Sequence, residues 1–472
     1  MKQNYVAAID IGTTKIACLI ANVSDEKNIE LVGMGTAKSN GVWCGQVLNI
    51  EQTVKSIEEA LLKAQAQAGV KISSVSVGIA GKNIRCTQNR GFINKESTDS
   101  EFTKADIDLL VRDQFKTMVN PGEEIIHVLP QDFIIDRAYP TDNPIGMIGK
   151  MLEANFHLVI CKKDSINNIK KCIDRAQLET DNIILEPLAS SDAVLNEDEK
   201  ETGVILIDIG GGTTDIAIYN NKMIVHTAVI PFGGNVITND IKSECGILER
   251  YAEELKKQYG EAVSDYTDSN KLVVVPGPKG REPKEISINL LANIIQSRME
   301  EILDAVQHEI NISGVSKRIG AGIVLTGGGS QLKNLQQLVA FKTGMDVRIG
   351  YPNEYIEANE IKDINNPMYS TAVGLLLKSV ETFTTKEQPI AKEVQKPEAP
   401  KFEMPKAEMP NFEATPKPEP RIERQIPVFA DIEDEFPTSP TKKKEAKPKK
   451  QRSDFFKSYI LNLFDGEDKK FE

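Results

Sequence analysis

The sequence predicts an α/β protein built from two related halves, and three observations support that prediction. An apolar run at 204–209 is followed by three glycines and a second apolar run at 216–219, the pattern of two buried strands joined by a tight turn. The same pattern opens the chain, with an Asp-Ile-Gly-Thr-Thr stretch at 10–14 between two apolar runs. A unit repeated after about 200 residues indicates duplication, and 472 residues exceed what one core usually holds.

Strand and helix patterns follow each other through the first half. We expect strands at 5–10, 15–23, 30–37 and 75–80, and a helix at 51–68. The first three strands read as a meander, because short polar segments separate them. The helix has one apolar face, which we expect to contain Val54, Ile57, Leu61 and Leu62.

The sequence pattern of residues 83–162 differs from that of the segments around them. We expect a helix at 103–118 and strands at 124–128 and 132–137, in a segment with prolines at 130, 140 and 144. No residue pattern in this segment is typical of catalysis. We therefore interpret it as an inserted recognition subdomain.

The remaining elements surround the second glycine loop and a third. We expect helices at 165–177, 187–195, 289–310, 332–340 and 367–375, a helical region at 231–259, and short strands at 183–186 and 323–326. The strand at 323–326 runs into Gly327–Ser330, and such a junction presents free N–H groups at a helix start. The helices at 187–195 and 367–375 consist of small residues and can pack closely on a neighbour.

Composition argues against several classes of function. A net charge of −12 makes the chain a poor binder of nucleic acid. The six cysteines form no Cys-x-x-Cys pair and the four histidines have no ligand spacing, so we expect reduced structural thiols and no zinc site. No apolar run approaches the ~18 residues that span a bilayer, and strand-like sequence begins at Tyr5, so we expect neither a transmembrane helix nor a signal peptide.

The C-terminal region has the composition of a disordered linker that ends in an amphipathic helix. Twelve of the 23 prolines lie between Pro389 and Pro448, and seven lysines and arginines follow at 442–452. Ser453 can cap a helix that Gly466 ends. Its apolar face would consist of Phe455, Phe456, Tyr459, Ile460, Leu463 and Phe464. This face needs an outside partner, either a membrane surface or a groove on a protein.

The glycine loops are candidates for phosphate binding. Glycine lets backbone N–H groups converge on an anion, and the neighbouring threonine hydroxyls add donors. Asp208 and Asp215 would repel a bare phosphate, so they fit chiefly with a divalent cation between them and it. A plain hairpin with glycines for positive φ is the alternative for one loop, and the second copy favours phosphate binding.

The loops at 10–15, 208–215 and 326–330, with connecting helices near 187–195 and 370–377, resemble the actin/Hsp70/sugar-kinase superfamily in type and order. The resemblance covers about 380 residues. It implies an actin-like ATPase fold of two related, ribonuclease H-like halves. Within the superfamily the chain is most similar to the FtsA family of bacterial cell-division proteins.

Three features carry the similarity to the FtsA family. The insert stands where that family has its subdomain 1C, and residues 146–159 are similar to the family's segment there. Residues 232–240 resemble the family's Gly-Gly-x-x-Ile-Thr-x-Asp signature. A linker ending in an amphipathic helix is the family's membrane tail, although this linker is longer and richer in proline. The resemblance implies subdomain 1A at 1–82 with 163–200 and 360–384, subdomain 1C at 83–162, subdomain 2A at 201–240 with 300–359, subdomain 2B at 241–299, a disordered linker at 385–452 and a membrane-targeting helix at 453–466.

The resemblance also implies that ATP and Mg²⁺ bind between the halves. Asp10 and Asp208 would hold Mg²⁺, and Lys15 would face the phosphates. The other residues that would contact the nucleotide are Gly12, Thr13, Thr14, Gly210, Gly211, Gly212, Thr213 and Thr214 at the phosphates and Gly327, Gly328 and Gly329 at the adenosine.

Three further polar residues have two interpretations each. Glu253 and Lys256 resemble the ribose and base contacts of bacterial actins, and a solvated helix face is the alternative. Glu186 matches the acid that can orient an attacking water, and a structural acid at a helix start is the alternative. We therefore expect slow ATP hydrolysis or none.

The functional hypothesis is a polymer-forming adaptor at the cytoplasmic face of the cell membrane at the division site. By resemblance its partners are the C-terminal peptide of FtsZ at subdomain 2B, further copies of itself, the inner membrane surface and other division proteins. The alternative is a metabolic kinase of the same superfamily, which the glycine loops fit equally. The sequence shows no convincing acceptor-side base for a kinase, and a kinase does not need an amphipathic tail.

Overall fold

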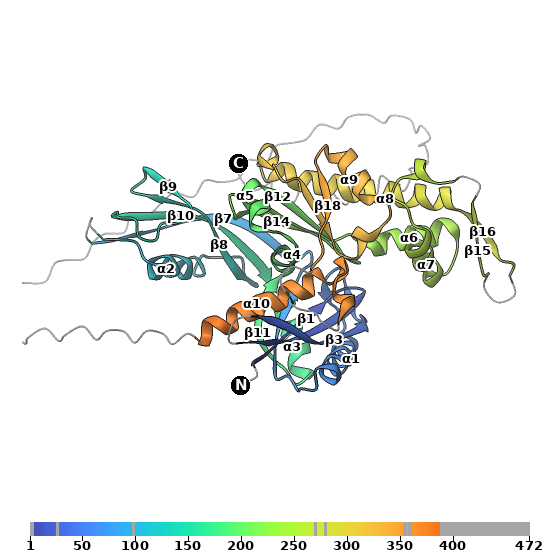
Figure 1. Cartoon of the computed structure of the whole chain (residues 1–472), viewed down its shortest axis with the longest axis horizontal. Coiled ribbons are helices and arrows are strands. Elements are labelled where there is room, and N and C mark those ends of the chain that lie inside the picture. The colour runs from blue at the N-terminus through green and yellow to red at the C-terminus, as the bar shows by residue number, and fades with distance from the viewer. Residues whose placement is uncertain are drawn as a thin grey trace, which may run out of the picture. The chain divides into compact units, whose positions relative to one another are not determined.

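Two five-stranded sheets of the same topology form the centre of the structure, a computed structural model (Figure 1). The first sheet has the order β11 (Glu179–Leu185), β6 (Ser74–Ile79), β1 (Asn4–Ile11), β2 (Lys15–Val23), β3 (Ile29–Lys38). The second has the order β18 (Val347–Ile349), β17 (Ile323–Thr326), β12 (Val204–Ile209), β13 (Thr214–Asn220), β14 (Met223–Ile230). In both, the central strand pairs antiparallel with the next strand in sequence and parallel with the strand on its other side. The predicted α/β fold of two related halves is confirmed.

The structure describes residues 4–24, 28–96, 100–268, 271–277, 281–352, 356 and 361–387. The predicted linker beyond residue 387 and the predicted amphipathic helix at 453–466 lie outside these residues. Within them, no helix is long and apolar enough to span a bilayer.

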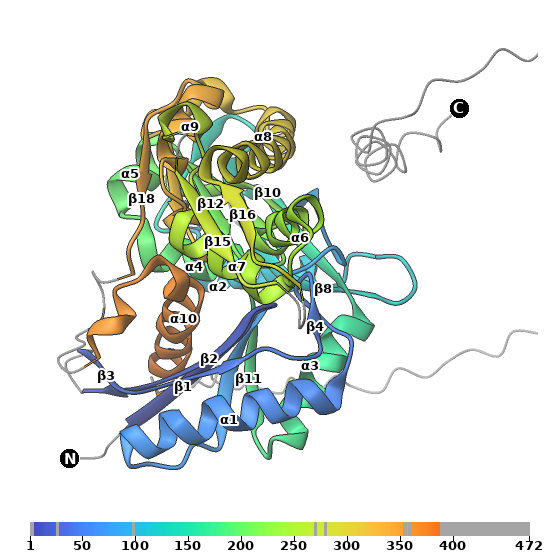
Figure 2. The ribbon, with the colours of Figure 1, turned by 90° about the vertical axis from the view of Figure 1, so that its right-hand side faces the viewer.

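Helices cover both faces of each sheet. The helices α1 (Ile50–Ala68) and α3 (Lys163–Arg175) pack on one face of the first sheet, and α10 (Ser370–Glu387) packs on the opposite face, as Figure 2 shows for α1 and α10. The helix α4 (Glu186–Val194) lies against α10, and both share one hydrophobic core with residues of the two sheets. The second sheet is covered on its outer face by α6 (Gly234–Cys245), α8 (Ile288–Ile312) and α9 (Leu335–Thr343).

The insert forms a sheet with its own core. Its antiparallel strands have the order β7 (Ile84–Asn94), β10 (Met151–Lys162), β8 (Glu123–Ile135), β9 (Tyr139–Thr141), and α2 (Lys104–Gln114) packs on them. The two strands that the sequence predicts around Pro130 are one continuous strand, β8. Pro130 pairs with Phe156 where the register shifts, and such an irregularity accommodates a residue without an N–H donor.

Smaller elements complete the chain. They are β4 (Val42–Trp43), β5 (Gln46–Val47), α5 (Glu197–Thr202), α7 (Glu249–Tyr259), β15 (Leu272–Val275), β16 (Lys284–Ser287) and the 3-10 helices η1 (Ser264–Tyr266), η2 (Ser316–Arg318), η3 (Gly328–Gln331), η4 (Lys362–Ile364) and η5 (Pro367–Tyr369). The helical region predicted at 231–259 is two helices, because Gly246 takes a left-handed φ of 58° and ends α6. The expectation for Leu62 was wrong: its side chain is 66% exposed, while the other three residues of the predicted face are buried.

Candidate functional site

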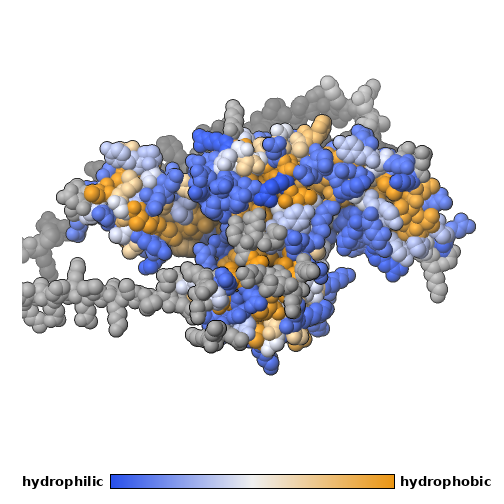
Figure 3. All heavy atoms as spheres, viewed as in Figure 1, coloured by the Kyte–Doolittle hydropathy of each residue, from blue (hydrophilic) through white to orange (hydrophobic). Residues whose placement is uncertain are grey.

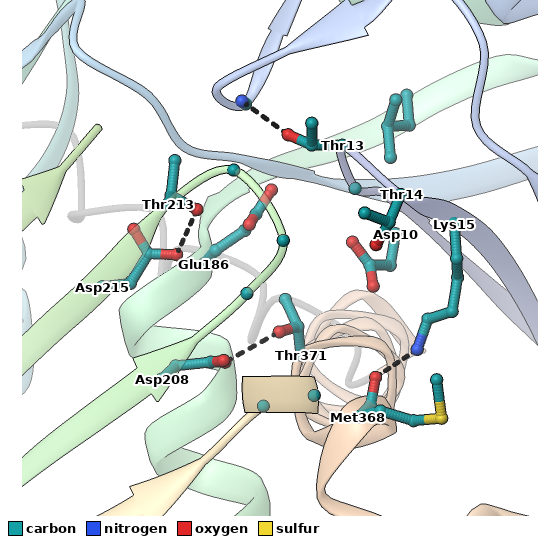
Figure 4. Close-up of a pocket in the computed structure, with 18 residues that line it drawn as sticks. Asp10, Thr13, Thr14, Lys15, Glu186, Asp208, Thr213, Asp215, Met368 and Thr371 are labelled. Atoms are coloured by element: carbon teal, nitrogen blue, oxygen red, sulfur yellow. Dashed lines mark hydrogen bonds between the residues drawn. The ribbon is translucent and has the colours of Figure 1, made fainter. Parts of the chain in front are cut away.

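The turns of the two glycine hairpins meet at one pocket (Figure 4). Residues 12–14 come from the β1–β2 turn of the first half, and residues 210–213 come from the β12–β13 turn of the second. A β-carbon added to Gly211 would lie 2.3 Å from Cγ2 of Thr14. The two loops therefore approach each other more closely than a residue with a side chain at this position would allow.

Most of the residues that the sequence predicts for the site line this pocket. They are Asp10, Gly12, Thr13, Thr14, Lys15, Glu186, Asp208, Gly210, Gly211, Gly212, Thr213, Gly327 and Gly328. Four predicted residues are not among the described residues that line it, namely Thr214, Gly329, Glu253 and Lys256. The Thr214 hydroxyl donates to the carbonyl of Phe232 at 2.8 Å, and Gly329 lies against Ile209.

The structure pairs Glu253 and Lys256 with each other and with α6. The Lys256 ammonium lies 2.7 Å from Oε2 of Glu253 and donates to Gly234 O at 2.9 Å and to Thr238 Oγ1 at 2.8 Å. The Lys256 side chain is only 13% exposed. The pair is therefore not a solvated helix face, and it fastens α7 to the start of α6. Its contact with a nucleotide stays a prediction.

Several lining residues were not in the predicted set. They are Ile11, Gly45, Asp215, Met368 and Thr371, of which Asp215 was noted only for its charge. The Gly45 N–H donates to Thr13 Oγ1 at 3.1 Å, from the turn between β4 and β5. No local pattern marks Gly45 or Met368, whereas Thr371 could have been found as a hydroxyl in the first turn of a connecting helix.

Four carboxylates line the pocket: those of Asp10, Asp208 and Asp215 are buried, and that of Glu186 is half-buried. Burial raises the pKa of Asp10 to about 6, against the attraction of Lys15. Burial also raises the pKa of Asp208. For Glu186 and Asp215, burial and then the charges of neighbouring carboxylates raise the pKa well above its usual value. Burying several carboxylates beside one lysine costs free energy that a bound cation would offset.

The ammonium of Lys15 has partners in η5, the 3-10 helix directly before α10. It donates to the carbonyl oxygen of Met368 and lies 3.9 Å from the centroid of the Tyr369 ring. Figure 4 shows Lys15 reaching toward Met368. Burial lowers the pKa of Lys15 to about 8, against the attraction of Asp10 and Asp208. The side chain of Lys15 thus links the first glycine loop to η5, which leads into α10.

The donors at the pocket fit Mg²⁺ bound together with phosphates. Among the residues that the structure describes, no three His, Cys, Asp or Glu side chains gather closely enough to hold a metal ion alone. Mg²⁺ is usually held by one or two carboxylates together with phosphate oxygens and water, and Asp10 and Asp208 supply one carboxylate from each half. The buried Oδ1 of Asp215 has no hydrogen-bond partner in the structure. The residues present therefore fit the ion.

The size of the pocket limits what it holds in this arrangement of the halves. Its volume is about 90 Å³, below the roughly 300–1,000 Å³ of most ligand pockets. The lining residues suit the phosphate end of a nucleotide. A complete nucleotide is larger than this pocket and would extend beyond its lining.

Comparisons with known proteins identify the relatives of this chain. A family profile described as "Cell division protein FtsA" matches residues 205–374, and one described as "SHS2 domain inserted in FTSA" matches residues 81–160. The cell division protein FtsA of Pseudomonas aeruginosa is 41% identical over 376 residues, which cover 80% of this chain and 89% of that protein. FtsA of Escherichia coli strain K12 is 35% identical over 399 residues, which cover 83% of this chain and 94% of that protein.

A solved structure agrees with the fold. The PilM-PilN type IV pilus biogenesis complex contains a chain that superposes with a TM-score of 0.59, at 15% identity, over 79% of this chain and 98% of that one. At this identity the likeness concerns the fold alone. The duplicated sheets therefore belong to an architecture that solved structures share.

Proposed function

This chain belongs to the FtsA family of cell-division proteins, and from that premise we propose that it binds ATP with Mg²⁺ between its two halves. The observation that carries the proposal is the approach of the two glycine turns, with Gly211 against Thr14, at a pocket lined by glycines, threonines and carboxylates. Phosphates would lie between these turns.

Each group at the pocket has a proposed role. Residues 12–14 and 211–213 would donate hydrogen bonds to the phosphates, and Lys15 would supply a compact positive charge. Asp10 and Asp208 would hold Mg²⁺, which supplies charge neutralisation at the phosphates. Gly327 to Gly329 would lie against the adenosine. Glu253 and Lys256 would act from behind the pocket wall, through α6.

Hydrolysis is proposed to be slow or absent. Glu186 is the candidate acid for orienting an attacking water, and it lines the pocket at the start of α4. A base must be ionised to accept a proton, and burial together with three nearby carboxylates raises the pKa of Glu186. ATP would then act chiefly as a ligand that fixes the arrangement of the two halves.

The proposed biological role is an adaptor that polymerises and tethers FtsZ filaments to the cytoplasmic face of the membrane at the division site. The tail supports this role by its composition. Burial of six large apolar side chains gives on the order of 10 kcal/mol gross, which helix ordering and partial immersion reduce. Seven basic residues could add roughly 1 kcal/mol each near an anionic surface, less in salt. One copy would bind reversibly, and a polymer would bind through many copies.

The FtsZ peptide is proposed to dock on the predicted subdomain 2B, residues 241–299. Apolar side chains are exposed there, and Leu272 and Val274 on β15 are 56% and 61% exposed. Figure 3 shows apolar residues at the surface in the region of β15 and β16. An exposed two-stranded sheet with alternating apolar side chains suits an extended or helical peptide with apolar anchors. Other division proteins are also proposed partners, and no docking surface on this chain is assigned to them.

The alternative function, a metabolic kinase, is not favoured. The curated relatives reported above are all cell-division proteins, and they match over most of their length. The glycine turns alone do not separate the two functions, because both would use them for ATP.

Electron microscopy on anionic lipid monolayers with Mg-ATP tests the proposed role. We expect membrane-bound filaments with the full chain and none after removal of residues 453–472. Removal of residues 467–472 is the matched control, because it leaves the predicted helix complete. Filaments that stay on the monolayer without the helix would contradict membrane tethering by the tail, and absence of filaments in every condition would contradict polymerisation.

A further inference from the structure

The carboxylate of Asp208 is held by two hydroxyl groups from two different helices. The Ser190 hydroxyl of α4 donates to Asp208 Oδ2 at 2.6 Å, and the Thr371 hydroxyl of α10 donates to the same oxygen at 3.0 Å. The two hydroxyl oxygens lie 3.1 Å apart. Figure 4 shows Thr371 pointing at Asp208.

Both donors engage one oxygen of the carboxylate, and the other oxygen is confined by the backbone. A β-carbon on Gly327 would lie 2.2 Å from Asp208 Oδ1, so only glycine at this position leaves room for that oxygen. A carboxylate offers about four lone-pair positions, and the two hydroxyls occupy those of Oδ2. The rotation of the carboxylate is therefore fixed, and Oδ1 is the oxygen that remains for a ligand.

The two hydroxyls come from the helices that connect the halves. The helix α4 follows β11 of the first sheet and leads to the second, and α10 follows β18 of the second sheet and packs on the first. Ser190 is fully buried. The orientation of the carboxylate thus depends on how α4 and α10 pack together.

We propose that Ser190 and Thr371 are positioning residues that orient Asp208 Oδ1 toward the Mg²⁺ of a bound Mg-nucleotide. The inference rests on the proposed function, because it takes Asp208 as a metal-holding group. Groups that orient a metal ligand typically change metal affinity by 10- to 100-fold when they are removed.

The test compares affinities for ATP with Mg²⁺ and for ATP with EDTA, measured by isothermal titration calorimetry. The ratio of the two affinities is the gain that the metal supplies. In the double variant Ser190→Ala and Thr371→Val, we expect this ratio to fall about 10- to 100-fold, because the affinity gained from Mg²⁺ is lost. A purely structural role would lower both affinities together.

Two further variants make the test specific. Thr371→Ser keeps a hydroxyl at this position and should retain most of the wild-type affinity ratio. If the double variant does not fold, the ratio is measured in the single variants Ser190→Ala and Thr371→Val. Ser191→Ala is the matched control, because the Ser191 hydroxyl donates to the carbonyl of Pro187 at 2.6 Å on the same helix. We expect Ser191→Ala to keep the wild-type ratio.

The outcomes separate this inference from the proposed function. If the wild type binds ATP in neither condition, nucleotide binding itself is wrong. If the wild type gains affinity from Mg²⁺ and the variants without hydroxyls keep that gain, the positioning role is wrong and nucleotide binding stands. Loss of the gain with recovery in Thr371→Ser supports the inference.

Discussion

A β-carbon placed on Gly374 would lie 1.7 Å from the carbonyl oxygen of Ala189, so α10 and α4 cross in direct backbone contact. This contact lies within one turn of Thr371 on α10 and beside Ser190 on α4. The same crossing therefore supports the hydrophobic core that both sheets share and the hydroxyls that hold Asp208.

Replacement of Gly374 by alanine should destabilise the fold. The added methyl group has no space against Ala189 O, so the helices must separate, and overpacking of a core typically costs about 1–3 kcal/mol or more. We expect a lower free energy of unfolding in chemical denaturation. Glu381→Ala on the exposed side of the same helix is the control and should change it by less than about 0.5 kcal/mol. An unchanged stability in Gly374→Ala would show that the crossing is loose.

Stability should fall in mild acid because of His127. The Leu185 N–H donates to Nε2 of His127 at 3.0 Å, and burial, with a smaller effect of Lys378, lowers the pKa of His127 to about 4. A lowered histidine pKa leaves stability intact above the unfolded value of about 6.5, and stability is lost as the pH falls from there toward 4. Between pH 6.5 and pH 4 the free energy of unfolding should fall by about 3 kcal/mol, because each pH unit contributes about 1.36 kcal/mol.

The variant His127→Gln tests this dependence by urea unfolding at about pH 7.5 and about pH 5. It should lose about 1–2 kcal/mol less than the wild type between the two conditions. His157, whose pKa burial also lowers to about 4, stays in the variant and keeps part of the pH dependence. His308→Gln, at an exposed position, is the control. The same pH dependence in His127→Gln and the wild type would refute the assignment.

Membrane binding by the tail should depend on its apolar face. In the predicted helix, Phe456 lies at the centre of that face and Ser458 lies opposite. We expect Phe456→Glu to reduce co-sedimentation with anionic vesicles strongly, because a charge replaces a side chain worth about 1.5–3 kcal/mol on burial. Ser458→Glu should bind the vesicles nearly as well as the wild type does. Equal binding by Phe456→Glu and the wild type would favour a protein groove as the partner of the helix.

The elements around the glycine turns could be predicted because their signals are local. Apolar runs bounded by glycine mark β1, β2, β12 and β13 within one or two residues, and the repeat of the pattern predicts the duplicated sheets. The insert was harder to predict. Its strand β7 is largely half-buried or exposed and lacks an alternating pattern, and β8 continues through Pro130 at a register shift. Both depend on pairing with β10, which no local pattern shows.

Some residues of the site could likewise be predicted from the local sequence, and others could not. Residues at strand ends, such as Asp10 and Asp208, could be predicted because the hairpin pattern fixes their place. Gly45 and Met368 reach the pocket only through tertiary packing, from a short turn and from η5. Glu253 and Lys256 came from the family resemblance, and the structure shows them paired with each other and bonded to α6.

The central claim is that the two glycine turns bind one Mg-nucleotide between them. Isothermal titration calorimetry of Mg-ATP with the wild type, Gly211→Ala and Gly122→Ala tests it most directly. In Gly211→Ala the new methyl group meets Thr14 and displaces the phosphate loop. Gly122 has a φ of 85° and lies outside the pocket lining, so Gly122→Ala strains the local backbone without a contact within 4 Å and controls for strain away from the pocket. We expect one binding site in the wild type. The affinity should be at least about tenfold weaker in Gly211→Ala, which corresponds to a loss of about 1.4 kcal/mol or more of binding free energy. Gly122→Ala should keep the wild-type affinity. No binding by the wild type, or equal affinity in all three proteins, would contradict the claim.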